Sequence, residues 1–123
     1  MARVFIAASY TRLKEAASLC AELERHGHIV VSTWIHEPSR EYLQGDAAME
    51  RSAKVDFRDL QQAEVVVCLT GDNGTRVERH SEVGMALGTG KRVILLGTRE
   101  QIYHWYPAVR VVNTIRRLIE VLA

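Results

Sequence analysis

Residues 64–69 read EVVVCL, and the remainder of the chain can be interpreted outward from this run. Apolar, β-branched side chains occur on both of its faces, as in strands of a parallel sheet that helices cover on both sides. We therefore expect residues 64–69 to form a central strand that is buried on both faces.

Strand and helix patterns alternate on either side of this run. Four further β-branched segments are expected to form strands: 3–7, 28–35, 92–96 and a brief 109–112. Helical spacing of apolar residues predicts helices over 11–26, 47–62, 80–87 and 114–122. This alternation implies right-handed βαβ units, a parallel sheet with helices on both faces, and one domain spanning 1–123.

The composition is that of a soluble globular protein, with 47% apolar residues, 25% charged residues and a formal net charge of +1. Because no block of basic residues occurs, we expect no nucleic-acid partner. No apolar run reaches the about 18 residues of a membrane span, so we expect no membrane association. Cys20 and Cys68 lie in apolar surroundings without CxxC spacing, which indicates buried thiols in a cytoplasmic protein.

Ligands of such sheets bind beyond the carboxyl ends of the strands. The segments that leave those ends are 8–12, 35–40, 70–81 and 97–103. The chain has no P-loop, since Gly90-Lys91 is followed by Arg92, and no G-x-G-x-x-G after its first strand. The histidines are scattered without metal-ligand spacing, so we expect no metal and no cofactor. For His80 and His104, a solvent-facing loop position is the simpler interpretation.

Residues 71–88, GDNGTRVERHSEVGMALG, contain two glutamates with different local explanations. Thr75-x-x-Glu78 fits a capping box, which gives Glu78 a sufficient structural role. If the helix begins near His80, Glu82 lies in its first turn, where the helix dipole favours an ionised carboxylate that could act as a nucleophile or anchor a ligand. The alternative is an ordinary surface glutamate. Gly84 would let a ligand or a neighbouring chain approach the backbone.

Asp56 is the second carboxylate to consider beside Glu82. A helix packed on the sheet could bring Asp56 to the ligand edge, whereas Asp59, one turn before the strand, could simply be solvated. Retaining glycosyl chemistry uses two carboxyl groups about 5 Å apart, one of them as the nucleophile.

Four segments, in this order, resemble the nucleoside 2-deoxyribosyltransferases and the related 2'-deoxynucleoside 5'-phosphate N-hydrolases. They are VFIAASY (4–10), HGHIVVSTW (26–34), DFRDLQQAEVVVCL (56–69) and SEVGMALGTGKRVILL (81–96). The last resembles the family's E-(L/V/F)-G-x-A-x-x-x-G-K-x-V block. The resemblance covers nearly the whole chain and implies a flavodoxin-like or Rossmann-like three-layer α/β sandwich with a five-stranded, mostly parallel sheet.

This resemblance also implies roles for single residues. Glu82 matches the nucleophile that attacks the anomeric carbon of the deoxyribose, and Asp56 matches the aspartate that contacts the sugar and positions the nucleophile. Tyr10 falls at a loop position beside the base or the sugar. Ser9 and Arg12 match positions that hold a 5'-phosphate in the hydrolase branch, as a loop that leads into a helix N-terminus favours an anion.

The chain departs from the family pattern in several places. His80 stands where glycine is usual, two residues before the nucleophile, and could contact the substrate. Asp72 is a candidate acid near the leaving base, and Glu64 opens a strand where aspartate is usual. Residues 108–123 do not resemble the segment with which true transferases complete a neighbour's site, which argues against base transfer more than against cleavage of the glycosidic bond.

The sequence therefore predicts a cofactor-free enzyme that cleaves the N-glycosidic bond of 2'-deoxynucleosides or their 5'-monophosphates, by hydrolysis or base transfer. Its expected partners are this small-molecule substrate and further copies of the chain, in a homodimer or larger homo-oligomer. One alternative is a non-catalytic nucleotide sensor. Another is a ribonucleotide or NAD glycohydrolase. The N-G-T-x-x-E stretch also resembles the GT-x-x-E of phosphoribohydrolases, and there Glu78 would be the catalytic acid.

Overall fold

The computed structural model describes residues 1–37, 45–74 and 76–123. Within these residues the strands are β1 (Arg3–Ala7), β2 (Ile29–Val30), β3 (Val65–Leu69), β4 (Arg92–Leu96) and β5 (Arg110–Val112). The helices are α1 (Leu13–Arg25), α2 (Asp46–Gln62), α3 (Val77–Gly88) and α4 (Ile115–Leu122), with 3-10 turns η1 (Tyr10–Arg12), η2 (Thr33–His36) and η3 (Ile102–Trp105). The capping residue Thr75 and the last three residues of the segment 35–40 fall outside the described residues.

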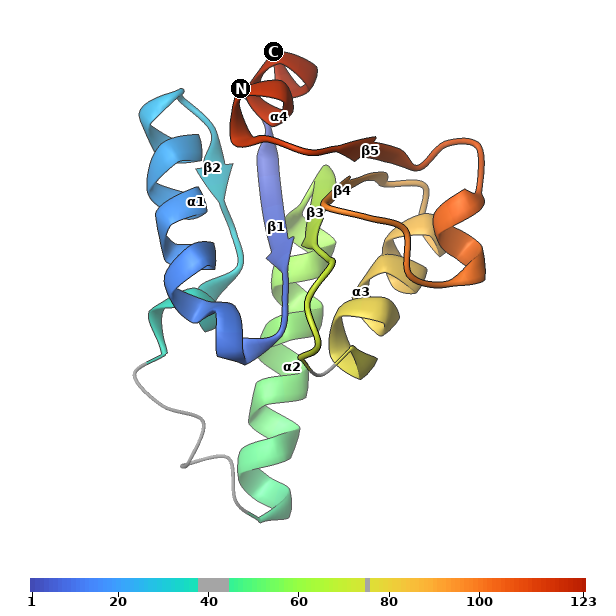
Figure 1. The fold of residues 1–123 in the computed structure, drawn as a ribbon. Helices are drawn as coiled ribbons and strands as arrows, with labels where there is room; N and C mark the ends of the chain where they lie inside the picture. The colour runs from blue at the N-terminus through green and yellow to red at the C-terminus, as the bar shows by residue number, and fades with distance from the viewer. Residues whose placement is uncertain (38–44, 75) are drawn as a thin grey trace.

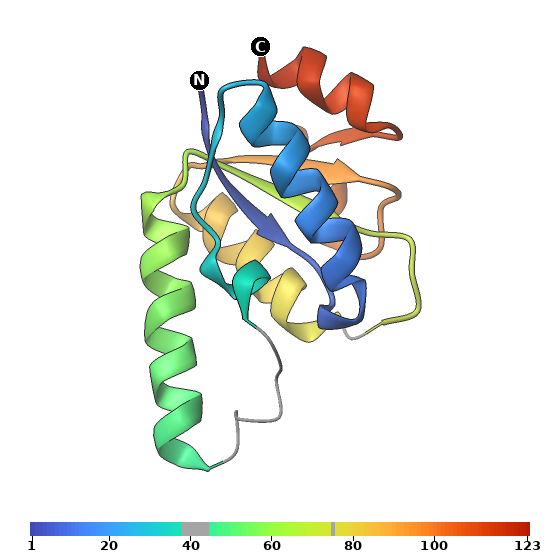
Figure 2. The same cartoon turned by 90° about the vertical axis from the view of Figure 1, so that its left-hand side faces the viewer.

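All neighbouring strands pair in parallel, in the order β2-β1-β3-β4-β5 (Figure 1). Helices α1 and α4 lie on one face of the sheet and α2 and α3 on the other (Figure 2). This arrangement confirms the three-layer α/β sandwich predicted from the alternation of strands and helices.

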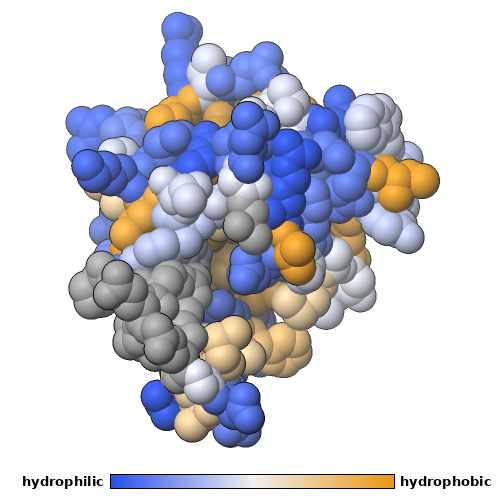
Figure 3. All heavy atoms as spheres, turned by 60° about the horizontal axis from the view of Figure 1, so that its bottom comes forward, coloured by the Kyte–Doolittle hydropathy of each residue, from blue (hydrophilic) through white to orange (hydrophobic). Residues whose placement is uncertain are grey.

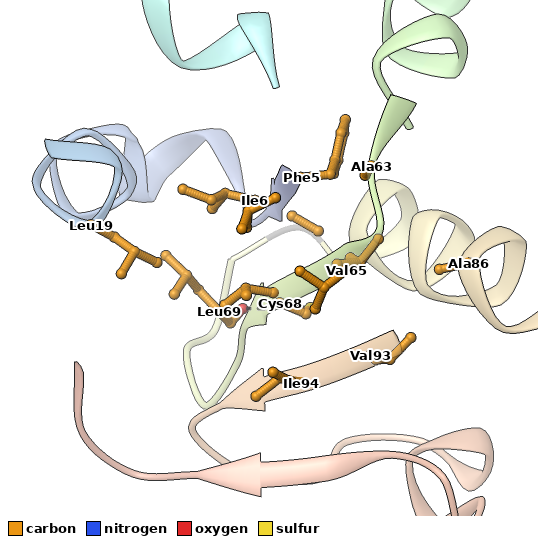
Figure 4. Packing of buried hydrophobic residues seen from close by; sticks show 14 of the residues in the cluster. Phe5, Ile6, Leu19, Ala63, Val65, Cys68, Leu69, Ala86, Val93 and Ile94 are labelled. Atoms are coloured by element: carbon orange, nitrogen blue, oxygen red, sulfur yellow. Dashed lines mark hydrogen bonds between the residues drawn. The ribbon is translucent and has the colours of Figure 1, made fainter. Parts of the chain in front are cut away.

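The core lies on both sides of β3, whose five residues are all buried, as the EVVVCL run predicts. In Figure 4, Leu19 of α1 and Ala86 of α3 lie on opposite sides of this strand. Cys20 and Cys68 are free and buried, and burial raises the pKa of each thiol to about 12. No helix in the described part of the chain is long and apolar enough to cross a bilayer.

The strand predicted over 28–35 is wrong beyond Val30, where β2 ends. Two side chains replace the backbone partners that a longer β2 would have offered to Ile6 of β1. The Ile6 amide donates to Ser32 Oγ at 3.0 Å, and the Trp34 indole donates to the Ile6 carbonyl at 2.8 Å. Because the amide and the carbonyl of Ile6 both have hydrogen-bond partners in this way, the chain can leave the sheet after Val30 and turn into η2.

Candidate active site

The candidate site lies where the order of the strands reverses, between β1 and β3, beyond their carboxyl ends. A pocket of about 470 Å³ opens there between the loop after β1 and the helices α2 and α3. Figure 3 looks onto this end of the molecule, where the surface is hollowed. The lining residues are Ala8, Ser9, Tyr10, Thr11, Trp34, Met49, Ser52, Ala53, Asp56, Glu78 and Glu82.

Among the described residues, three carboxylates line this pocket. Glu82 projects from α3 and is 9% exposed, and Asp56 projects from α2 and is half-buried. Glu78 lies one turn before Glu82 on the same face of α3 and is exposed. The structure therefore brings the two expected catalytic acids into one cavity, as their places on two helices of the same layer require.

Glu78 is a lining residue that the capping-box interpretation set aside. Helix α3 begins at Val77 with Arg76 at the N-cap position, and the Arg76 side chain makes no cap hydrogen bond. The helix thus starts three residues earlier than expected, which places Glu78 in the first turn and Glu82 in the second. Both glutamates then face the pocket, because residues four apart share one face of a helix.

The loop after β1 supplies the opposite wall. Ser9 is buried, and its hydroxyl lies 2.9 Å from that of Thr11. The Tyr10 ring packs against Trp34 with centroids 6.3 Å apart, and the Tyr10 hydroxyl donates to the carbonyl of Glu37. An aromatic wall opposite carboxylates suits a ligand with one apolar face and one polar edge, such as a base joined to a sugar.

Arg12 and Asp72, also predicted to bind substrate, are not among the residues that line this pocket. Arg12 donates to Asp72 Oδ1 at 2.9 Å, to the Thr70 carbonyl at 3.1 Å and to Glu15 at 2.7 Å. It lines a separate hollow of about 480 Å³ between α1, α4 and the ends of β3 and β4. Burial opposes the ionisation of Asp72, but hydrogen bonds from Arg79, the Gly74 amide and Arg12 outweigh it and lower its pKa to about 2.

His80 likewise does not line the pocket. Its Nε2 lies 3.1 Å from Glu100 Oε1, and its ring meets that of His104 edge to face at 5.3 Å. His104, expected to face solvent, is fully buried. The His104 Nδ1 accepts a hydrogen bond from the Glu100 amide at 2.9 Å. The pKa of His104 is lowered, mainly by its burial and secondly by the nearby His80.

Arg79 joins these groups into one network. Its side chain is 0% exposed and bonds to both oxygens of Asp72 at 2.9 and 3.1 Å and to both oxygens of Glu100 at 2.9 and 2.8 Å. Glu100 also accepts from the Gly71 amide, and its pKa is lowered although its burial opposes this. Sequence reasoning missed Arg79. The sequence feature that could have indicated it is its position in α3. Arg79 is a charged residue on the same side of the helix as Val83 and Ala86, which are buried.

Gly74 connects this network to the pocket. Its amide donates to Asp72 Oδ2 at 2.9 Å. A Cβ atom at this position would lie 2.5 Å from Ser9 Oγ and 2.6 Å from Asp72 Oδ2. The loop after β3 can therefore lie against the loop after β1 because residue 74 has no side chain.

No group of three or more His, Cys, Asp or Glu side chains that could hold a metal ion occurs among residues 1–37, 45–74 and 76–123. The described residues that line the pocket offer carboxylates, hydroxyls and aromatic rings.

Three solved structures share this fold with the chain. A 2-deoxyribosyltransferase from Bacillus psychrosaccharolyticus is 18% identical with a TM-score of 0.73, over 96% of this chain and 90% of that one. A CMP N-glycosidase from Clostridium botulinum is 19% identical with a TM-score of 0.64, over 98% and 97% of the two chains. A conserved protein from Enterococcus faecalis is 17% identical with a TM-score of 0.71, over 98% and 96%.

No protein-family model matches the chain, and a search of curated proteins by sequence found no match. The structural likeness extends over 96–98% of this chain. The chain therefore has the three-layer fold of a 2-deoxyribosyltransferase, as its sequence motifs predict.

Proposed function

We propose that the protein cleaves the N-glycosidic bond of a 2'-deoxynucleoside or its 5'-monophosphate, with Glu82 as the nucleophile. The observation that carries this proposal is the common cavity of Glu82 and Asp56 at the carboxyl edge of the sheet. A second support is that two proteins of this fold are a 2-deoxyribosyltransferase and a CMP N-glycosidase.

In the first step the Glu82 carboxylate attacks C1' of the sugar. The bond from C1' to the base nitrogen breaks, its electron pair leaves with the base, and the base takes up a proton from water. In the second step a water molecule attacks C1', releases the Glu82 carboxylate and forms the free sugar. The proton lost by this water balances the one taken by the base.

The remaining residues have supporting roles in this proposal. Asp56 holds the sugar and positions it against Glu82, while Ser9 and Tyr10 contact the sugar and the base from the opposite wall. Because Arg12, Asp72 and His80 are engaged with other side chains beside the pocket, they act on the substrate through the loops that they fix. No cofactor takes part.

The first prediction concerns the identity of the nucleophile. The Glu82→Gln side chain keeps the shape but lacks the attacking charge, so we expect base release to fall by about a thousandfold or more. The measurement is chromatography of free base from the four common 2'-deoxynucleosides, their 5'-monophosphates, AMP and NAD.

Glu78→Gln is the matched variant, since Glu78 lines the same cavity one turn away. If base release survives Glu82→Gln and is lost in Glu78→Gln, the assignment of the nucleophile is wrong and the phosphoribohydrolase alternative holds. If neither the wild type nor the variants release base, and a nucleotide still raises the melting temperature, the protein is a sensor.

The acceptor and the assembly are further parts of the proposal. We propose water as the acceptor, so adding a second free base should give no exchanged nucleoside. We also propose a homodimer or larger homo-oligomer in the cytoplasm. Light scattering of the purified protein measures the assembly, and a mass of one chain would contradict it.

A further inference from the structure

Asp59 is a buried carboxylate that the proposed reaction does not use. Its interpretation as a solvated residue is wrong, because it is 1% exposed. A carboxylate is costly to bury unless hydrogen-bond donors surround it. The Asp59 Oδ2 atom accepts from the Thr33 amide at 3.0 Å and from the Thr33 hydroxyl at 2.7 Å, and Arg58 donates to Oδ1 at 3.2 Å. Since the N-cap residue Ser32 makes no side-chain cap hydrogen bond, Asp59 holds the start of η2 from the neighbouring helix α2.

The turn η2 in its turn holds the aromatic wall of the pocket, which consists of Tyr10 and Trp34. Trp34 lies in η2, and its ring packs against that of Tyr10 with centroids 6.3 Å apart. At the other end of the turn, the carbonyl of Glu37 accepts from the Tyr10 hydroxyl at 3.1 Å. The turn therefore contacts Tyr10 both at its ring and at its hydroxyl.

Helix α2 also carries the carboxylate that the proposed function assigns to the sugar. Asp56 lines the pocket from this helix, and Asp59 follows three residues later, on an adjacent position of the helix surface. Asp59 itself is not among the described residues that line the pocket. One helix thus positions Asp56 directly and the aromatic wall through η2.

We propose that Asp59 is a positioning residue, which holds Trp34 and Tyr10 at the distance from Asp56 that a base joined to a sugar requires. The inference rests on the proposed function for its kinetic readout. Contacts between the base and the aromatic rings are alike in the ground state and the transition state. Their loss should therefore raise KM and leave kcat nearly unchanged.

Trp34 offers a readout that does not depend on turnover. The chain has two tryptophans, of which Trp105 is 63% exposed and Trp34 is 3% exposed. In a Trp105→Phe background, all tryptophan fluorescence comes from Trp34. Asp59→Ala removes the acceptor of the Thr33 amide and hydroxyl. We therefore expect the emission of Trp34 to shift to longer wavelength and its quenching by acrylamide to increase.

The kinetic measurement uses the same background and the best substrate of the nucleoside and nucleotide panel. Asp59→Ala should raise KM by about tenfold and change kcat by less than about twofold. Asp59→Asn keeps an oxygen that can accept from Thr33, so it should restore the emission and most of the loss in KM. Glu50→Ala is the matched control. It removes an exposed carboxylate that lies 3.5 Å from Lys54 on the same helix, and it should change neither reading.

Titration of the Trp34 fluorescence with the same panel measures binding without turnover, which separates this inference from the proposed function. If the wild type releases no base, but Asp59→Ala shifts the emission and weakens binding, the proposed function is wrong and the inference holds. An emission that Asp59→Ala leaves unchanged would overturn the inference, and so would a fall in kcat at constant KM.

Thr33→Val provides the test if Asp59→Ala does not fold. This variant removes only the hydroxyl donor, at an exposed position, and leaves the Thr33 amide on Asp59. We expect the same changes in emission and KM to a smaller extent. Wild-type values of both in Thr33→Val would then overturn the inference.

Discussion

Gly74 and Gly84 lie on either side of the catalytic candidates, and their surroundings are opposite. A side chain at position 74 would collide with Ser9 and Asp72, whereas a Cβ atom at position 84 meets nothing within 4 Å. From the sequence, Gly84 was the glycine expected to permit a close approach. Within the described chain Gly74 has that property, as does Gly97, where a Cβ atom would lie 2.5 Å from the Thr70 carbonyl oxygen. Closeness between two loops depends on tertiary packing that no local pattern encodes.

We expect Gly74→Ala to lower the melting temperature and the rate of base release, since Ser9 must shift to admit the methyl group. Gly84→Ala is the matched control. It should stabilise the protein by up to about 1 kcal/mol, because alanine is favoured over glycine inside a helix. Thermal unfolding and the base-release assay measure both effects. A Gly74→Ala variant as stable and active as the wild type would show that the two loops are not held together in this way.

At the scale of elements, α3 joins the buried network to the pocket. One stripe of the helix carries Arg79, which binds the loop after β3 through Asp72 and the segment after β4 through Glu100. The adjacent face carries Glu78 and Glu82. The orientation of these two carboxylates therefore depends on an ion network that they do not touch.

We expect Arg79→Met to destabilise the protein by about 3–5 kcal/mol, since two carboxylates would lose their buried partner. Arg25→Met removes an arginine that is 72% exposed and pairs with Glu22, so it should change stability by less than about 1 kcal/mol. Urea unfolding measures both. Equal effects of the two substitutions would contradict the structural importance of the buried network.

For the whole molecule, the periodic segments of the sequence predicted the order of strands and helices. Residues 92–96 and 65–69 are strands as expected, since each is apolar on both faces. The short β2 was not predictable, because Ser32 and Trp34 replace its backbone pairing through side chains. For the pocket, the sequence motifs indicated Asp56 and Glu82, and the structure places both there. The sequence did not indicate the Arg79 network, because the partners of Arg79 lie in two other segments, the loop after β3 and the segment after β4.

The pH dependence of stability belongs to this scale as well. In the folded protein, burial lowers the pKa of His28 and His104 below 6.5, the ordinary value of a histidine. The unfolded chain then binds protons more readily, so stability should fall as the pH drops below about 6.5. The ionised Asp72 carboxylate also contributes to stability. This contribution is lost at lower pH, as the pH falls from about 4 to about 2, the pKa of Asp72 in the folded protein.

Urea unfolding at about pH 7.5 and about pH 5.5 tests this dependence. The groups that act on His104 are His80, Glu100, Arg79 and Arg99. His104→Asn keeps an acceptor for the Glu100 amide but cannot be protonated, so the loss of stability between the two pH values should be smaller than in the wild type. His36→Asn, at an exposed position, is the control. An unchanged pH slope in His104→Asn would refute the role of this histidine.

The short outer strands of the sheet have a consequence for how the protein behaves in concentrated solution. β2 and β5 form the two edges and contain two and three residues, against five in each of the strands between them. Strand-by-strand polymerisation needs a long row of unpaired backbone groups onto which another chain can add. These short edges offer few unpaired backbone groups, so the native protein is a poor template for the growth of fibrils.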